Sequence, residues 1–123
     1  MEEVFDSSLA ADYAMTIVLD FIKALNKEDY KKARTFLSDY VIFTGVLTSR
    51  NGAANYLQDL ERMKIKYAIK KVFMEGSDIC LIYDLTISGL SIYACGVYEV
   101  VAGKIGAVRM VYDPRQVLDL IPA

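Results

Sequence analysis

The sequence contains no histidine, and this absence excludes several kinds of active site at once. Serine and cysteine nucleophiles that rely on a histidine base are excluded, and so are zinc sites with histidine ligands. Only Cys80, Cys95 and scattered carboxylates remain as ligands for a transition metal. We therefore predict that the protein uses no metal and no cofactor.

The chain also lacks the patterns by which proteins bind nucleic acids, nucleotides and membranes. It has 14 basic and 16 acidic residues, and its one basic cluster, residues 64–71, has the spacing of a solvated strand face. The segment "GKIGAV" lacks the spacing of a phosphate-binding glycine loop. No apolar run reaches the roughly 18 residues of a membrane span. We predict no nucleic-acid partner and no membrane partner.

What the chain does have is a large apolar content within the length of one domain. Apolar types make up 54% of its 123 residues, which is enough to bury a sizeable core. The first ten residues are acidic where a signal peptide is basic, and the two cysteines lie in strand-like runs, as small apolar residues do in a reducing compartment. These features predict a single domain in the cytoplasm.

The hydrophobic pattern changes its period once along the chain. Apolar residues first recur every three to four positions, which predicts helices over residues 8–26, 26–37 and 51–63, with a strand or hairpin at 38–49. They then alternate, which predicts antiparallel strands at residues 65–74, 78–88, 91–101 and 104–112. Helices followed by a strand meander indicate an α+β fold.

Both faces of the last three strands are largely apolar, whereas the helices of one chain can cover only one face. Leu81, Tyr83, Leu85 and Tyr98 lie on the same side of their strands, and we assign them to the uncovered, convex face. An apolar sheet face without a cover indicates a second subunit. We therefore predict a homodimer that associates through the convex face.

Four segments in a fixed order carry a family resemblance: "IVLDFIKALNKEDYKKARTFLSDYVIFTG", "NGAANYLQDL", "FMEGSDICLIYDL" and "GVYEVVAGKIGAVRMVYDP". Together they resemble the nuclear transport factor 2-like superfamily, and within it the SnoaL-like group. The resemblance implies a single SnoaL-like domain over residues 1–123, with a core of about 10–118. It also implies a cystatin-like fold, in which a cone-shaped, curved antiparallel sheet wraps around three N-terminal helices and encloses a pocket.

The resemblance includes two groups of enzymes whose functional positions can be compared with this chain. In ketosteroid isomerases, the two groups that hold the oxyanion correspond to Phe21 and Cys95, and the base corresponds to residues 43–45, which contain no carboxylate. In limonene-type epoxide hydrolases, an Arg-x-Asp pair corresponds to Ile82 and Asp84, and a second aspartate corresponds to Met110. Asp84 alone keeps the residue type of its counterpart.

By the same resemblance, the side of the strand that carries Cys80, Ile82 and Asp84 faces the pocket. Around Asp84 the resemblance places a set of polar and apolar lining residues: Phe21, Thr44, Tyr56, Ile82, Cys95, Met110 and Tyr112. The alternative interpretation makes Asp84 a hydrogen-bonded structural carboxylate, and makes Tyr56 and Tyr112 core aromatics with satisfied hydroxyl groups.

Two functions are consistent with this pattern. The first is a protein that binds a small lipophilic ligand in its interior without converting it. The second is a small isomerase, cyclase or hydrolase in which Asp84 acts as general acid or base on a carbonyl or epoxide compound, because an apolar cavity disfavours the charged form of a carboxyl group. We favour ligand binding, since Asp84 lacks the partners that either enzyme group uses; whether the protein is an enzyme is left open.

Overall fold

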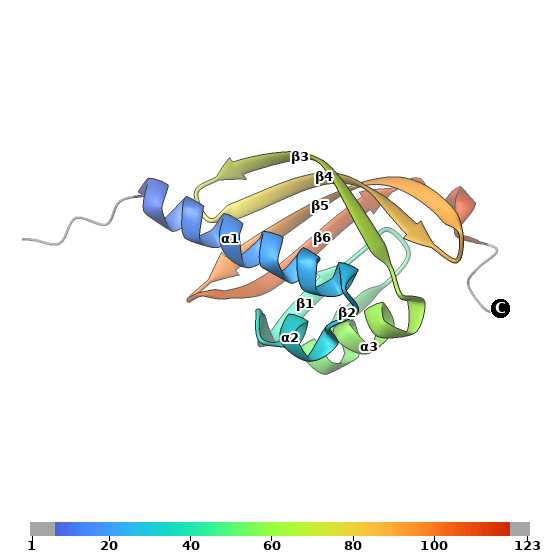
Figure 1. Ribbon diagram of the computed structural model, residues 1–123, viewed down its shortest axis with the longest axis horizontal. Helices are drawn as coiled ribbons and strands as arrows, with labels where there is room; N and C mark the ends of the chain where they lie inside the picture. The colour runs from blue at the N-terminus through green and yellow to red at the C-terminus, as the bar shows by residue number, and fades with distance from the viewer. Residues whose placement is uncertain (1–6, 119–123) are drawn as a thin grey trace, which may run out of the picture.

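The computed structural model describes residues 7–118, in which helices lie against one face of a curved, unclosed six-stranded sheet (Figure 1). The acidic first residues of the chain, 1–6, lie outside this range. The strand order is β2-β1-β6-β5-β4-β3. The strands are β1 (Leu37–Thr44), β2 (Ser49–Asn51), β3 (Lys66–Glu75), β4 (Asp78–Ile87), β5 (Leu90–Val101) and β6 (Lys104–Tyr112). The α+β fold class expected from the sequence is confirmed.

One strand pair departs from the expected antiparallel arrangement. The strands β3, β4, β5 and β6 form an antiparallel meander, and β1 and β2 form an antiparallel hairpin. β1, however, runs parallel to β6, with Leu37 opposite Ile105 and Thr44 opposite Arg109. A register shift between Leu37 and Ile42 leaves residues 38–41 outside this pairing. The parallel pair joins the hairpin to the meander.

The helices cover the sheet from one side. α1 (Ser7–Asn26) crosses the meander and contacts β3, β4 and β6, whereas α3 (Ala53–Met63) contacts β1 and β2 (Figure 1). α2 (Tyr30–Arg34) is shorter than the predicted helix, because Leu37 is buried and already belongs to β1. The short 3-10 helix η1 (Pro114–Gln116) follows β6. None of the helices within residues 7–118 is long and apolar enough to cross a membrane.

The face of the sheet that carries the core is the one turned toward α1, and we call it the inner face. On β4 it holds Ile79, Leu81, Tyr83 and Leu85, each at most 2% exposed. On α1 the buried stripe recurs with helical spacing: Ala14, Ile17, Val18, Phe21, Ile22 and Leu25. Burying each large apolar side chain contributes about 1.5–3 kcal/mol to the stability of this contact.

The orientation of the meander predicted from the sequence is therefore wrong. Leu81, Tyr83, Leu85 and Tyr98, which we assigned to the convex face, lie on the inner face beneath the helices of their own chain. Successive side chains of a strand point to opposite faces, so exchanging the two faces moves every side chain of the strand. The other side, which we call the outer face, carries Cys80, Ile82 and Asp84.

A glycine on β5 provides the space for the side chain of Tyr83 on the inner face. A Cβ atom added to Gly96 would lie 2.1 Å from Oη of Tyr83 and 2.9 Å from Cε1 of Tyr98. Gly96 pairs with Leu81, and Ala94 pairs with Tyr83. Small residues at both positions of β5 thus let the ring of Tyr83 lie over the neighbouring strand.

We expect Gly96→Ala to lower the free energy of unfolding by about 1–3 kcal/mol, the usual cost of overpacking a core. The measurement is a urea unfolding curve. Because the closest atom is the hydroxyl oxygen of Tyr83, adding Tyr83→Phe should give a double variant that is more stable than the sum of the two single effects predicts. Unchanged stability of Gly96→Ala, or strict additivity, would contradict the close approach.

Candidate functional site

Four tyrosine side chains meet in the space between the inner face and the helices. They come from four elements: Tyr56 from α3, Tyr67 from β3, Tyr83 from β4 and Tyr98 from β5. Each is at most 5% exposed. The rings of Tyr67 and Tyr83 meet edge to face with centroids 5.3 Å apart. We call these four residues the tyrosine cluster.

The hydroxyl groups of the cluster are only partly satisfied. The oxygens of Tyr83 and Tyr98 lie 2.7 Å apart and share a hydrogen bond. Among the residues that the structure describes, the buried hydroxyls of Tyr56 and Tyr67 have no hydrogen-bond partner, and neither has that of Tyr30 in α2. Buried polar groups are normally paired, so these unpaired donors need an explanation.

Burial keeps the hydroxyl groups of the cluster protonated. Desolvation raises the pKa of Tyr56 well above its ordinary value, and the nearby phenols of Tyr67 and Tyr98 raise it further. Desolvation likewise raises the pKa values of Tyr67, Tyr83 and Tyr98. The cluster therefore provides neutral hydrogen-bond donors at neutral pH, and none of its members can act there as a base.

The surrounding elements hold three members of the cluster in place. The side chain of Asn26, at the end of α1, donates a hydrogen bond of 2.9 Å to the carbonyl oxygen of Tyr67 and accepts one of 2.7 Å from its N–H. The ring of Phe43 stacks on Tyr56 with centroids 5.1 Å apart. Gly96 leaves room for Tyr83, as described above. Tyrosine hydroxyls thus project from rigid elements into one region.

The interior around the cluster carries no charge. Within the described part of the chain, no charged side chain is buried. Over the same residues, no group of three or more histidine, cysteine, aspartate or glutamate side chains could hold a metal ion. The arrangement can donate hydrogen bonds to a neutral oxygen atom, but it offers no carboxylate for acid or base catalysis.

Some of the predicted lining residues do lie together on the inner side. Phe21 and Tyr56 are buried there, with ring centroids 6.4 Å apart, and Met110 is buried on β6. Tyr112, two residues further along the same side of β6, is half-buried. That these side chains contact a ligand stays a prediction.

The other predicted site residues lie on the outer face, so their placement in the pocket is wrong. Asp84 is 34% exposed, and Nζ of Lys70 lies 3.5 Å from its Oδ2 atom. Ile82 and Cys95 are half-buried on the same face, and Thr44 is exposed at the end of β1. The physical reason is the exchange of faces, because α1 covers the side of β4 that carries Tyr83. Asp84 therefore lies outside the interior in which we expected it to act as a general acid or base.

Three members of the tyrosine cluster are not among the site residues predicted from the sequence. The predicted orientation of the meander puts Tyr83 and Tyr98 on the convex face, and no prediction involves Tyr67. A signal for them was present, because each tyrosine falls within one of three consecutive strands, among alternating apolar residues. Assigning the tyrosine-bearing side of these strands to the core places Tyr67, Tyr83 and Tyr98 together in the interior.

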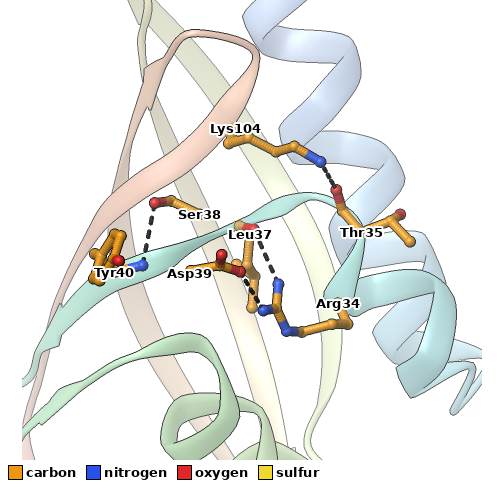
Figure 2. Close-up of a pocket in the computed structure, with 7 residues that line it drawn as sticks. All are labelled: Arg34, Thr35, Leu37, Ser38, Asp39, Tyr40 and Lys104. Carbon is orange, nitrogen blue, oxygen red and sulfur yellow. Dashed lines mark hydrogen bonds and ion pairs between the residues drawn. The ribbon is translucent and has the colours of Figure 1, made fainter.

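A surface groove lies elsewhere, beside the unpaired part of β1. It has a volume of about 490 Å³ and is lined by Arg34, Thr35, Leu37, Ser38, Asp39, Tyr40 and Lys104 (Figure 2). Arg34 forms an ion pair with Asp39, and Nζ of Lys104 donates to the carbonyl oxygen of Thr35 (Figure 2). Since both cations are already engaged within the protein, the groove offers no clear binding chemistry.

Comparisons with known proteins agree on one family. The family model of the limonene-1,2-epoxide hydrolase catalytic domain matches residues 13–122. An NTF2-like protein of unknown function from Cytophaga hutchinsonii is 36% identical, with a TM-score of 0.83, over 95% of this chain and 98% of its own. Among curated proteins, no sequence matches significantly.

More distant structures share the fold. An LEH-like epoxide hydrolase from M. tuberculosis is 24% identical, with a TM-score of 0.73 over 89% of each chain. An uncharacterized cystatin fold protein from Novosphingobium aromaticivorans is 14% identical, with a TM-score of 0.72, over 79% of this chain and 96% of its own. At these identities the likeness concerns the backbone arrangement.

The hydrogen bonding of the cluster predicts opposite effects for two similar substitutions. Tyr83→Phe leaves the buried hydroxyl of Tyr98 unpaired, so we expect the free energy of unfolding to fall by about 1–2 kcal/mol. Tyr67→Phe removes a hydroxyl that has no partner within residues 7–118, so stability should be unchanged or higher. Urea unfolding of the two ligand-free variants makes the comparison, and equal losses would contradict the hydrogen-bond assignment.

Proposed function

The chain belongs to the limonene-1,2-epoxide hydrolase catalytic domain family, within the nuclear transport factor 2-like superfamily, and we propose that it binds a neutral lipophilic molecule in its interior. An oxygen atom of that molecule accepts hydrogen bonds from the hydroxyl groups of Tyr56 and Tyr67. Phe21 and Met110 supply part of the apolar surroundings.

The observation that carries this proposal is the pair of unpaired hydroxyl donors in an uncharged interior. A buried donor without an acceptor costs about 1–3 kcal/mol of stability. A ligand oxygen that accepts hydrogen bonds from Tyr56 and Tyr67 removes that cost. Part of the binding free energy therefore comes from satisfying donors that are unpaired in the ligand-free protein. Because no charged side chain is buried among the described residues, a charged ligand would be disfavoured there.

The ring of Phe43 suggests how a ligand reaches the cluster. Phe43 stacks on Tyr56, yet it is only partly buried, at the margin of the core between β1 and α3. Its displacement would open a way to the hydroxyl of Tyr56. The unbranched side chain of Met110 can also change its conformation to fit a ligand.

Binding is better supported than the hydrolysis for which the family is named. On β4, the strand that carries the resemblance to the epoxide hydrolase Arg-x-Asp pair, the inner face holds Ile79, Leu81, Tyr83 and Leu85, so neither an arginine nor an aspartate of this strand reaches the interior. The side chains that reach the interior are phenols and apolar groups. They can orient an oxygen atom, but they supply no base with which to activate water.

Titration with Nile red, a neutral lipophilic dye with a carbonyl oxygen, tests the proposal. We expect the dye to bind, and we expect Tyr56→Phe and Tyr67→Phe each to weaken binding about fivefold, the effect of one hydrogen bond of roughly 1 kcal/mol. Asp84→Asn, on the outer face, is the matched control and should leave the affinity unchanged. Native mass spectrometry of the purified protein would identify a molecule that co-purifies.

The test has a clear negative outcome. If the dye binds with the same affinity to both phenylalanine variants and to the unchanged protein, the hydroxyl groups do not hold its oxygen. If Asp84→Asn alone weakens binding, the ligand lies against the outer face and the proposed interior site is wrong.

We also propose that a second copy of this chain covers the outer face. Apolar side chains lie across five neighbouring strands of that face: Ile42, Phe73, Ile82, Tyr93, Val97 and Val111. Two ion pairs, Lys70 with Asp84 and Arg109 with Glu99, lie among them. A large apolar face with opposite charges on one surface can pair with its own copy about a two-fold axis.

A cytoplasmic location stays a prediction from the sequence.

The homodimer can be tested by sedimentation equilibrium. We expect twice the chain mass of 13.8 kDa for the unchanged protein and a shift toward the monomer for Val111→Glu, which places a charge on the outer face. Val111 is 63% exposed, so the substitution should leave the monomer folded. Leu47→Glu, outside the sheet between β1 and β2, is the matched control. A monomer in the unchanged protein would contradict the proposal.

A further inference from the structure

Cys80 on β4 and Cys95 on β5 are the only two cysteines of the chain, and their Sγ atoms lie 3.2 Å apart on the outer face. We propose that they form a dithiol redox site that reacts with a low-molecular-weight disulfide and closes into an intramolecular disulfide between the two strands. The inference concerns the outer face and does not depend on what the interior binds.

The strand register brings the two thiols together. Cys95 pairs with Ile82, and Cys80 pairs with Val97, so the cysteines are diagonal neighbours on adjacent antiparallel strands. The hydrogen-bonded ladder holds both backbones while the side chains lean toward each other. Bond formation requires the sulfur atoms to approach from 3.2 Å to about 2.05 Å apart.

Either sulfur atom can begin the reaction, because both side chains are half-buried and neither is enclosed in the core. The thiolate is the reactive form of cysteine. Whichever sulfur reacts first, the other lies 3.2 Å away and completes the reaction.

The reaction proceeds in two exchanges, each through a thiolate. One cysteine loses its proton and attacks one sulfur of the small disulfide, which forms a mixed disulfide and releases one small thiol that takes up the proton. The other cysteine then loses its proton and attacks the Sγ atom of the first, which forms the Cys80–Cys95 bond and releases the second small thiol that takes up this proton. Two electrons pass from the protein to the small disulfide, which leaves as two thiols.

The position of the pair links its reactivity to the outer face. Both side chains are half-buried, so a small disulfide can approach them in a single copy of the chain. A second copy over the same face would exclude the oxidant. The rate of oxidation should then fall as the protein concentration rises, whereas a monomer would react at a rate independent of concentration.

Oxidised glutathione with native protein, at a protein concentration low enough to give the monomer in sedimentation, followed by intact-mass measurement, tests the site. We expect a loss of two hydrogen masses and no retained glutathione in the folded, unchanged chain. Cys80→Ser and Cys95→Ser should each retain one glutathione on the remaining cysteine, because the second sulfur is missing. The unchanged chain unfolded in urea is the control, and it should accumulate glutathione adducts before it closes.

Three outcomes would overturn the proposal. The folded monomer could keep both thiols free under conditions in which the unfolded chain reacts, it could retain glutathione on both cysteines, or the two serine variants could take up no glutathione. Urea unfolding provides a second measurement of disulfide formation, independent of the intact mass. The oxidised protein should unfold at a higher urea concentration than the reduced protein, since a bond between β4 and β5 restricts the unfolded chain.

Discussion

The contact between α1 and the inner face of the meander determines the role of nearly every side chain in the sheet. Once α1 covers Ile79, Leu81, Tyr83 and Leu85, the alternation of each strand places Cys80, Ile82 and Asp84 on the opposite face. The hydrogen bonds between Asn26 and Tyr67 join the end of that helix to β3. The interior chemistry and the outer surface therefore follow from one packing choice.

That packing choice places phenol hydroxyls, and no charged side chain, in the described part of the interior. The enzymes to which the chain was compared use carboxylates, whereas the described part of this core contains buried phenols without a buried charge. A phenol donates a hydrogen bond without giving up its proton at neutral pH, so it can orient an oxygen atom without acting as a base. The fold supports both kinds of site, because function depends on which side chains face inward.

The fold was accessible from the sequence, whereas the orientation of the strands was not. Period and turn signals located α1, α3 and the four strands of the meander to within a few residues, since these depend on local preferences. The choice between the two faces of β4 depends on which one meets the helix, and both faces carry apolar side chains. In the sequence, Asp84 is a lone carboxylate within an apolar strand, but Lys70 on the neighbouring strand β3 forms an ion pair with it. The tyrosine cluster depends on cross-strand register and on the space beside Gly96, and neither can be read from one strand alone.

The parallel pairing of β1 with β6 has a consequence for how the protein is made. β1 can pair with β6 only when Ile105 lies opposite Leu37, and these two residues are far apart along the chain. During synthesis the hairpin of β1 and β2 leaves the ribosome long before β6 does. Until then the edge of β1 is unpaired, and the side of α3 that contacts β1 has only part of its support. Closing such a long loop is costly in entropy, so the sheet gains its full cooperativity only with its last strand.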